Sequence, residues 1–233
     1  QLKFTIDSKS LPDMFNSSNK VLKLHSALKS HFTNTSPHTE PSHVPTNLTF
    51  FYPAAREEIS KLISQSSNTF CDLDPIPTSI LKQCLPILLP TITNIVNLSL
   101  SSGVFPKQFK LSSVIPLLKK YNLDKEDLSN YRPISHLSFL SKLTERVVKQ
   151  RLTHHLSSNG LLNSLSAAFD TIDHSILIRR LSSWFGLKGT VLSWLQSYLS
   201  SRNFVVNIKP SLSASLPLPQ GVAQGSVLGP LLF

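Results

Sequence analysis

The sequence predicts a helix-rich fold of the α+β class. Several long segments carry apolar residues at helical spacing, whereas three short segments are apolar and rich in β-branched residues. Helices and strands do not alternate regularly along the chain, which argues against a doubly wound parallel sheet. The chain has 233 residues, of which 40% are hydrophobic, so it is long enough to bury a substantial core.

Order is expected to begin near Leu48. Residues 1–47 are rich in Ser, Thr, Asn and Pro, and this composition is typical of a linker or a poorly ordered segment. The periodicity from Ala54 to Ser64 then predicts a helix. Three of its apolar residues are expected to face inward: Ile59, Leu62 and Ile63.

A long uncharged segment follows a loop at residues 71–77. Residues 83–106 carry no charge, which is enough length to cross a bilayer. Prolines and polar residues interrupt this segment, and its apolar residues form a single helical stripe: Leu81, Leu85, Leu88, Ile92 and Ile95. We therefore expect a core helix rather than a membrane span, kinked near its prolines, capped by Thr78 or Ser79 and ended by Gly103.

Two strands and a helix are predicted next. Residues 110–118 are apolar and β-branched, and residues 131–137 would be the partner strand or an extended return. A helix is predicted over residues 138–157. Its polar side carries five basic residues: Lys142, Arg146, Lys149, Arg151 and His154. Such a stripe is by default a solvated face, and it could also follow a phosphate backbone.

The remaining elements are shorter. Helices are predicted over residues 173–182 and 189–199, and alternating apolar residues predict a strand over residues 202–208. A loop rich in Ser and Pro then leads to a glycine-containing segment at residues 221–230.

The charge balance points to a polyanionic partner. The chain has 23 Lys and Arg against 13 Asp and Glu, a formal charge of +10. This excess favours nucleic acid first and an anionic membrane second, although a soluble protein can be basic without either partner.

The two cysteines, Cys71 and Cys84, cannot form a disulfide framework and match no zinc spacing. Buried free thiols suit a reducing intracellular compartment, nuclear or cytoplasmic. Because the chain begins with Gln1 and stops within an apolar run, both ends are expected to be cut. The sequence carries no signal for an oligomer.

Several short motifs occur in a fixed order: Asp72–Pro77, Gly103–Pro106, Ile115–Lys120, Tyr131–Ser135, Ala167–His174 and Gln224–Pro230. In this order they resemble the reverse transcriptase of non-LTR retrotransposons, over roughly residues 73–233. Each motif alone is weak, but so many in register leave little room for coincidence. The resemblance implies a truncated and internally deleted fragment of a right-hand polymerase, with fingers at residues 48–160 and an incomplete palm at residues 161–233.

The resemblance also implies a chemistry. Relatives of this kind are nucleotidyltransferases that perform RNA-directed DNA synthesis from dNTPs on an RNA template and DNA primer, with Mg²⁺ and without a membrane partner. Lys119 or Lys120, together with Arg132, would bind the triphosphate of the incoming nucleotide. Taken alone, the lysines could equally be a solvated strand end, and Arg132 could be a surface residue.

The catalytic metal site is where this sequence departs from the family. Phe169 matches the aromatic residue that excludes a 2′-hydroxyl, and the metal-binding Asp should precede it by five positions. Ser164 stands there instead, and a neutral hydroxyl is a poor ligand for a hard dication. A deletion that joins the fingers to the tail of the palm motif accounts for this. Asp170 and Asp173 are candidate substitutes, but an Asp here more often caps a helix.

Gln224 and Gly225 match the segment that contacts template and nucleotide, with Ala223 where Pro is usual. Gln220 lies in a second Pro-Gln-Gly, but the register of residues 226–233 favours Gln224. A plain glycine-rich turn is the alternative for this segment.

The second metal motif of the family is expected beyond Phe233. We therefore expect no catalytic residue and no bound metal in this chain, and hence an inactive polymerase fragment. Two other functions remain open, a non-catalytic basic module that binds RNA or DNA and an inert retrotransposon relic.

Overall fold

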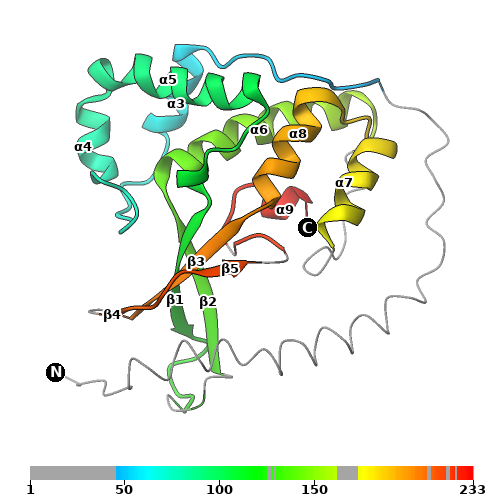
Figure 1. Cartoon of the computed structure of the whole chain (residues 1–233). Helices are drawn as coiled ribbons and strands as arrows, with labels where there is room; N and C mark the ends of the chain where they lie inside the picture. Colours follow the sequence, from blue (N-terminus) through cyan, green and yellow to red (C-terminus); the bar gives the residue numbers. More distant parts are fainter. Residues whose placement is uncertain are drawn as a thin grey trace, which may run out of the picture.

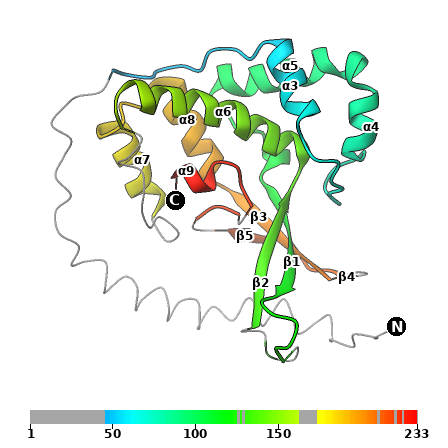
Figure 2. The same cartoon turned by 180° about the vertical axis from the view of Figure 1, so that it is seen from behind.

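The computed structural model describes residues 46–124, 127, 130–161, 173–208, 211–218, 221–223 and 225–232. In this part of the chain, helices gather at one end and a long hairpin of two strands projects from them (Figures 1 and 2). The mixed α and β composition expected from the sequence is confirmed. The predicted linker at residues 1–47 lies almost wholly outside the described residues.

The first helices follow the predicted pattern, with one correction. Helix α3 spans Arg56–Ser64 and buries Ile59 and Ile63. The long helix breaks into α4, Thr78–Gln83, and α5, Leu85–Ser102, and the break falls just before a proline, as expected. The predicted cap by Thr78 or Ser79 is wrong. Pro77 occupies the cap position, and the Thr78 hydroxyl instead donates to the carbonyl of Thr69 at 2.9 Å.

Helix α5 has the length and composition of a membrane span, and it is the only such helix in the described residues. It nevertheless buries a stripe against the rest of the chain, including Ile92, Val96 and Leu100. Two other apolar side chains, Ile87 and Leu98, are 81% and 58% exposed. Gly103 ends the helix as predicted, with φ at +67° and an ideal β-carbon only 3.0 Å from the carbonyl oxygen of Thr190.

The described strands form one five-stranded sheet. Strand β1, Leu111–Leu118, pairs antiparallel with β2, Tyr131–Leu137, and parallel with β3, Arg202–Ile208. These three strands are the ones that the sequence predicts. Two short strands, β4 at Ser211–Leu212 and β5 at Leu216–Leu218, pair with β3 and replace part of the expected loop.

The later helices are also as predicted. Helix α6 spans Phe139–Ser158 and is capped by Ser138, whose hydroxyl accepts from the amide of Ser141. Helices α7, His174–Ser183, and α8, Gly189–Leu199, follow. A single 3₁₀ turn, η1 at Lys107–Phe109, precedes β1, and the short helix α9 spans Gly229–Leu232.

One continuous hydrophobic core joins the described parts of the predicted fingers and palm ranges. Its centre is aromatic. Trp194 of α8 lies edge-on to Phe51 and Phe105 and stacks on Tyr198 at 5.4 Å between ring centroids. The indole N–H donates to the Ser99 hydroxyl at 2.9 Å, so the one polar atom of this ring is satisfied.

Candidate nucleotide and nucleic-acid site

The basic residues predicted to hold a triphosphate lie at the far end of the β1–β2 hairpin. Leu117 stands opposite Arg132, and the amide of Lys119 donates to the carbonyl of Asn130 at 2.8 Å, which extends the strand pairing by one register. Strand β1 ends at Leu118, so Lys119 and Lys120 follow the strand directly, whereas Arg132 lies within β2. All three basic side chains are exposed.

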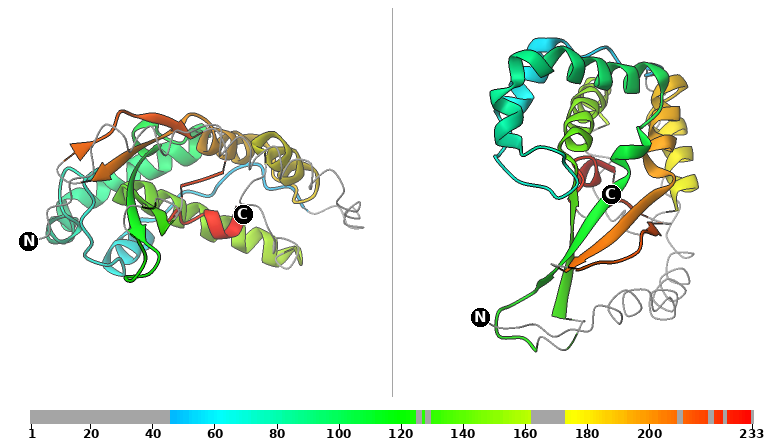
Figure 3. Two further views of the ribbon diagram at one scale, coloured as in Figure 1. Left: turned by 90° about the horizontal axis from the view of Figure 1, so that it is seen from below. Right: turned by 60° about the vertical axis from the view of Figure 1, so that its left-hand side comes forward.

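The glycine segment lies against the base of the same hairpin. Gly225 has φ at +113°, and an ideal β-carbon there would lie 2.7 Å from the carbonyl oxygen of Ser135 in β2. Only glycine permits so close an approach in this backbone conformation. Figure 3 shows α9, which follows this segment, beside α6 and the hairpin. Gln224 and Phe169 lie outside the described residues, as does Ser164.

A buried carboxylate, which the sequence reasoning missed, holds the residues after Gly225. Glu145 of α6 is fully buried, and its Oε2 accepts from the amides of Val227 and Leu228 at 2.7 and 3.1 Å. The hydroxyl of Ser226 lies 3.0 Å from the same oxygen. The sequence itself indicates that Glu145 is buried. It lies three and seven residues before the apolar positions 148 and 152, on the same face of the helix.

Tyr198 completes this polar cluster. Its hydroxyl lies 3.3 Å from Oε2 of Glu145 and 2.7 Å from the hydroxyl of Ser226. Burial, and then the negative charge of Glu145, raises the pKa of Tyr198 well above its ordinary value. The phenol therefore stays protonated and available as a hydrogen-bond donor throughout the neutral pH range.

A buried arginine lies on the other side of Tyr198. The guanidinium of Arg202 sits 4.6 Å from the Tyr198 ring centroid and 5.6 Å from that of Phe105. Its Nη1 donates to the carbonyl of Tyr198 at 3.0 Å, but Nε and Nη2 have no hydrogen-bond partner among the described residues. Burial, and then the nearby charge of Arg202, lowers the pKa of Lys110.

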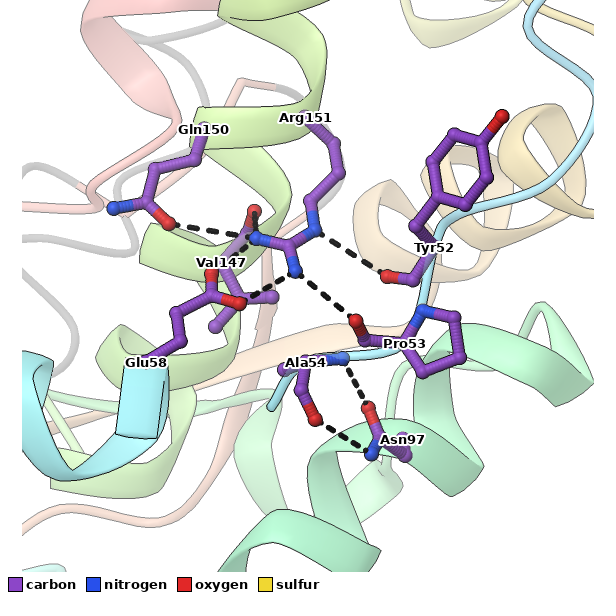
Figure 4. A network of polar contacts seen from close by, with 8 residues as sticks. All are labelled: Tyr52, Pro53, Ala54, Glu58, Asn97, Val147, Gln150 and Arg151. Carbon is purple, nitrogen blue, oxygen red and sulfur yellow. Dashed lines mark hydrogen bonds and ion pairs between the residues drawn. The ribbon is translucent and has the colours of Figure 1, made fainter. Parts of the chain in front are cut away.

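The basic stripe of α6 is only partly a solvated face. Figure 4 shows Arg151 in an ion pair with Glu58 and within 3.4 Å of the carbonyl oxygens of Tyr52 and Pro53. Arg146 donates to the hydroxyl of Ser66. Both arginines therefore tie α6 to α3 and its flanking segments, and for them the default interpretation as a solvated face is wrong. Contacts so distant in sequence leave no periodic signal.

Acidic residues of the described chain also have structural partners. Asp74 accepts from the amide of Phe139 at 2.8 Å, and burial raises the pKa of its carboxyl group. Asp72 accepts from the Asn207 side chain at 2.7 Å. Asp173 caps α7 by accepting from the amide of Ser175 at 2.7 Å, and this hydrogen bonding lowers the pKa of Asp173.

No group of three His, Cys, Asp or Glu side chains that could hold a metal ion occurs among the described residues. Asp170, the other candidate ligand, lies outside them. Both cysteines are free thiols, as predicted, with Cys71 buried and Cys84 half-buried.

An open groove of about 580 Å³ separates α7 from α8. His174 is one of the lining residues, and its Nε2 lies 2.9 Å from the carbonyl oxygen of Gly221. This contact ties the start of α7 to the glycine segment, so that segment is held from two sides.

Gly225→Ala is expected to lower the free energy of unfolding by about 1–3 kcal/mol and to loosen the segment that follows it. The new methyl group would push the segment away from Ser135. Gly189→Ala is the matched control, since its β-carbon would lie 2.6 Å from the carbonyl oxygen of Thr49 and within 4 Å of no hairpin residue among its nearest atoms. Urea denaturation measures the loss of stability, and amide hydrogen exchange at Val227 and Leu228 measures the local loosening. Equal acceleration of exchange at these two amides in both variants would contradict a local role for Gly225.

Comparisons with known proteins place the chain among retrotransposon proteins. It is 31% identical to the probable RNA-directed DNA polymerase from transposon BS of Drosophila melanogaster, over 60% of this chain and 19% of that protein. It is 29% identical to the corresponding X-element protein of the same organism, over 80% of this chain and 24% of that protein. The chain is 26% identical to a Pol polyprotein from the type-1 retrotransposable element R2 of Popillia japonica, over 78% of this chain and 30% of that protein. No family model matches the chain.

Proposed function

Because the chain is a relative of the RNA-directed DNA polymerases of non-LTR retrotransposons, we propose that it is a fingers and partial-palm portion of such an enzyme. It spans less than a third of the length of the relatives compared above. Its own function, on this proposal, is to bind a primer–template and an incoming nucleotide without completing nucleotide transfer.

The observation that carries the proposal is the group of exposed cations at the far end of the hairpin, Lys119, Lys120 and Arg132. Exposed cations at the end of one hairpin suit a polyphosphate or a nucleic-acid backbone, and the planar fork of arginine binds phosphate oxygens in pairs. Gly225 touches the same strand three residues from Arg132, a separation of about 10 Å. The hairpin and the glycine segment would therefore meet one ligand together.

The residues of this chain do not fit the Mg²⁺ ions that the family implies. A serine hydroxyl at position 164 supplies no negative charge, and the carboxylate of Asp173 already accepts a hydrogen bond as the cap of α7. An electrostatically driven site that loses even one ligand is expected to lose several powers of ten in rate. The proposal is therefore a binding fragment that is inactive as a polymerase.

A binding titration with charge-matched variants tests the proposed function. The double variant Lys119→Ala/Arg132→Ala is expected to weaken binding of an RNA–DNA primer–template and to lower its log–log salt slope by about 1–2. The control is Arg56→Ala/Lys188→Ala, which removes two exposed cations that lie outside the hairpin. Equal effects of the two double variants would contradict the assignment.

Two further measurements separate the alternatives. Primer extension with dNTPs and Mg²⁺ is expected to show no incorporation, and incorporation above background would overturn the inactive assignment. A thermal melt followed by circular dichroism is expected to be cooperative, because the core is continuous. A flat melt would instead favour the inert relic.

A further inference from the structure

We propose that Glu145 is a positioning residue, which fixes the backbone of residues 225–228 and thereby presents that segment to the nucleic acid or nucleotide. The inference rests on the proposed function for its ligand. The anchoring itself can be tested without any ligand.

The first argument is the cost of placing a carboxylate there. Glu145 lies on the buried face of α6, between Leu143 and Val147, which are also fully buried. A charged group at such a position is strongly unfavourable unless hydrogen bonds compensate it. An apolar residue would serve packing alone, so the acid is explained by the donors that surround it.

The second argument is where those donors come from. The amides of Val227 and Leu228 point to a single oxygen of Glu145, and the hydroxyl of Ser226 lies within hydrogen-bond distance of the same atom. Ser226 in turn accepts from the amide of Gly229 at 2.9 Å. Three consecutive residues are therefore held by one side chain from a helix about eighty positions earlier.

The third argument is the arrangement of charge. Arg202 is the nearby buried cation, yet it contacts the ring of Tyr198 rather than the carboxylate. The hydroxyl of the same tyrosine lies 3.3 Å from Oε2 of Glu145. The cation can offset the negative charge across the ring, while Oε2 remains directed at the segment. A direct ion pair would compete with the backbone amides for that oxygen.

The anchor connects the two parts of the candidate site, the hairpin cations and the glycine segment. Helix α6 begins directly after β2, the strand that carries Arg132. Glu145 lies less than two turns into that helix and holds the segment next to Gly225. The hairpin cations and the glycine segment are thus linked through one short, rigid stretch of chain.

Amide hydrogen exchange on the full chain tests the anchor. Glu145→Ala is expected to speed exchange at Val227 and Leu228 by about 100-fold, relative to a core amide such as that of Leu195. Glu145→Gln keeps an acceptor oxygen and is expected to retain most of the protection. The control is Glu58→Ala, which removes another carboxylate bonded to α6 but none that touches the segment. Unchanged protection in Glu145→Ala would overturn the proposal.

Duplex binding by the same variants tests the presentation of the segment. Glu145→Ala is expected to weaken binding of an RNA–DNA primer–template about 10-fold through lost preorganisation, with recovery in Glu145→Gln and no change in Glu58→Ala. Lost protection with unchanged affinity would overturn the positioning role. If the parent chain binds no duplex, the proposed function fails, and the exchange measurement alone then decides whether Glu145 anchors the segment.

Discussion

Trp194→Ala is expected to lower the free energy of unfolding by about 3–5 kcal/mol, a large part of the stability of a domain this size. The indole is fully buried at the centre of the aromatic core and contacts Phe51, Phe105 and Tyr198. Its removal leaves a cavity lined by rigid rings that cannot collapse into the space. It also leaves the Ser99 hydroxyl without the indole donor.

Trp184→Ala provides the matched control, because Trp184 is only half-buried and packs beneath Arg180 at 4.9 Å. Removing the indole is expected to lower the free energy of unfolding by about 1 kcal/mol or less through the lost cation–π contact. The loss of its partly buried apolar area adds to this effect. Urea denaturation followed by far-UV circular dichroism compares the two variants without depending on tryptophan emission. Similar losses in both would show that the core does not centre on Trp194.

The elements that the sequence predicts well are those with a local periodic pattern. Helix α6 carries apolar residues at helical spacing and a capping serine, and β1 is a short apolar segment with β-branched residues and a turn signal after it. The strands β4 and β5 were not predicted because they have only two and three residues, too few to carry a periodic pattern. Their pairing with β3 depends on the tertiary fold.

The candidate site is predictable to a smaller extent. Lys119, Lys120 and Arg132 belong to separate segments of the sequence, and only the antiparallel pairing of β1 with β2 brings them to one end of a hairpin. Glu145 and Arg202 were overlooked because a charged residue is usually assigned to the surface. Both are in phase with apolar neighbours, Glu145 along the helix and Arg202 with Phe204 and Val206 along β3. A charged residue on the apolar face of a helix or strand therefore indicates a buried charge with a partner.

Arg202→Met is expected to leave the free energy of unfolding within about 1 kcal/mol of the parent, whereas Arg202→Ala is expected to lower it by about 2–4 kcal/mol. Arg202 is buried with two nitrogen atoms that have no partner in the described structure, and each such group carries a desolvation cost. Methionine removes that cost and still fills the space against Tyr198 and Phe105. Alanine removes the cost but also the packing.

Urea denaturation of both variants, repeated with Glu145→Gln in the background, decides what the arginine contributes. If packing dominates, methionine matches the parent in either background. If the positive charge is required to offset Glu145 across the Tyr198 ring, methionine is as destabilising as alanine, and neutralising Glu145 reduces the loss. That second result would contradict the expectation for Arg202→Met. It would also mean that the buried acid and the buried base stabilise the fold as a pair, although no hydrogen bond joins them.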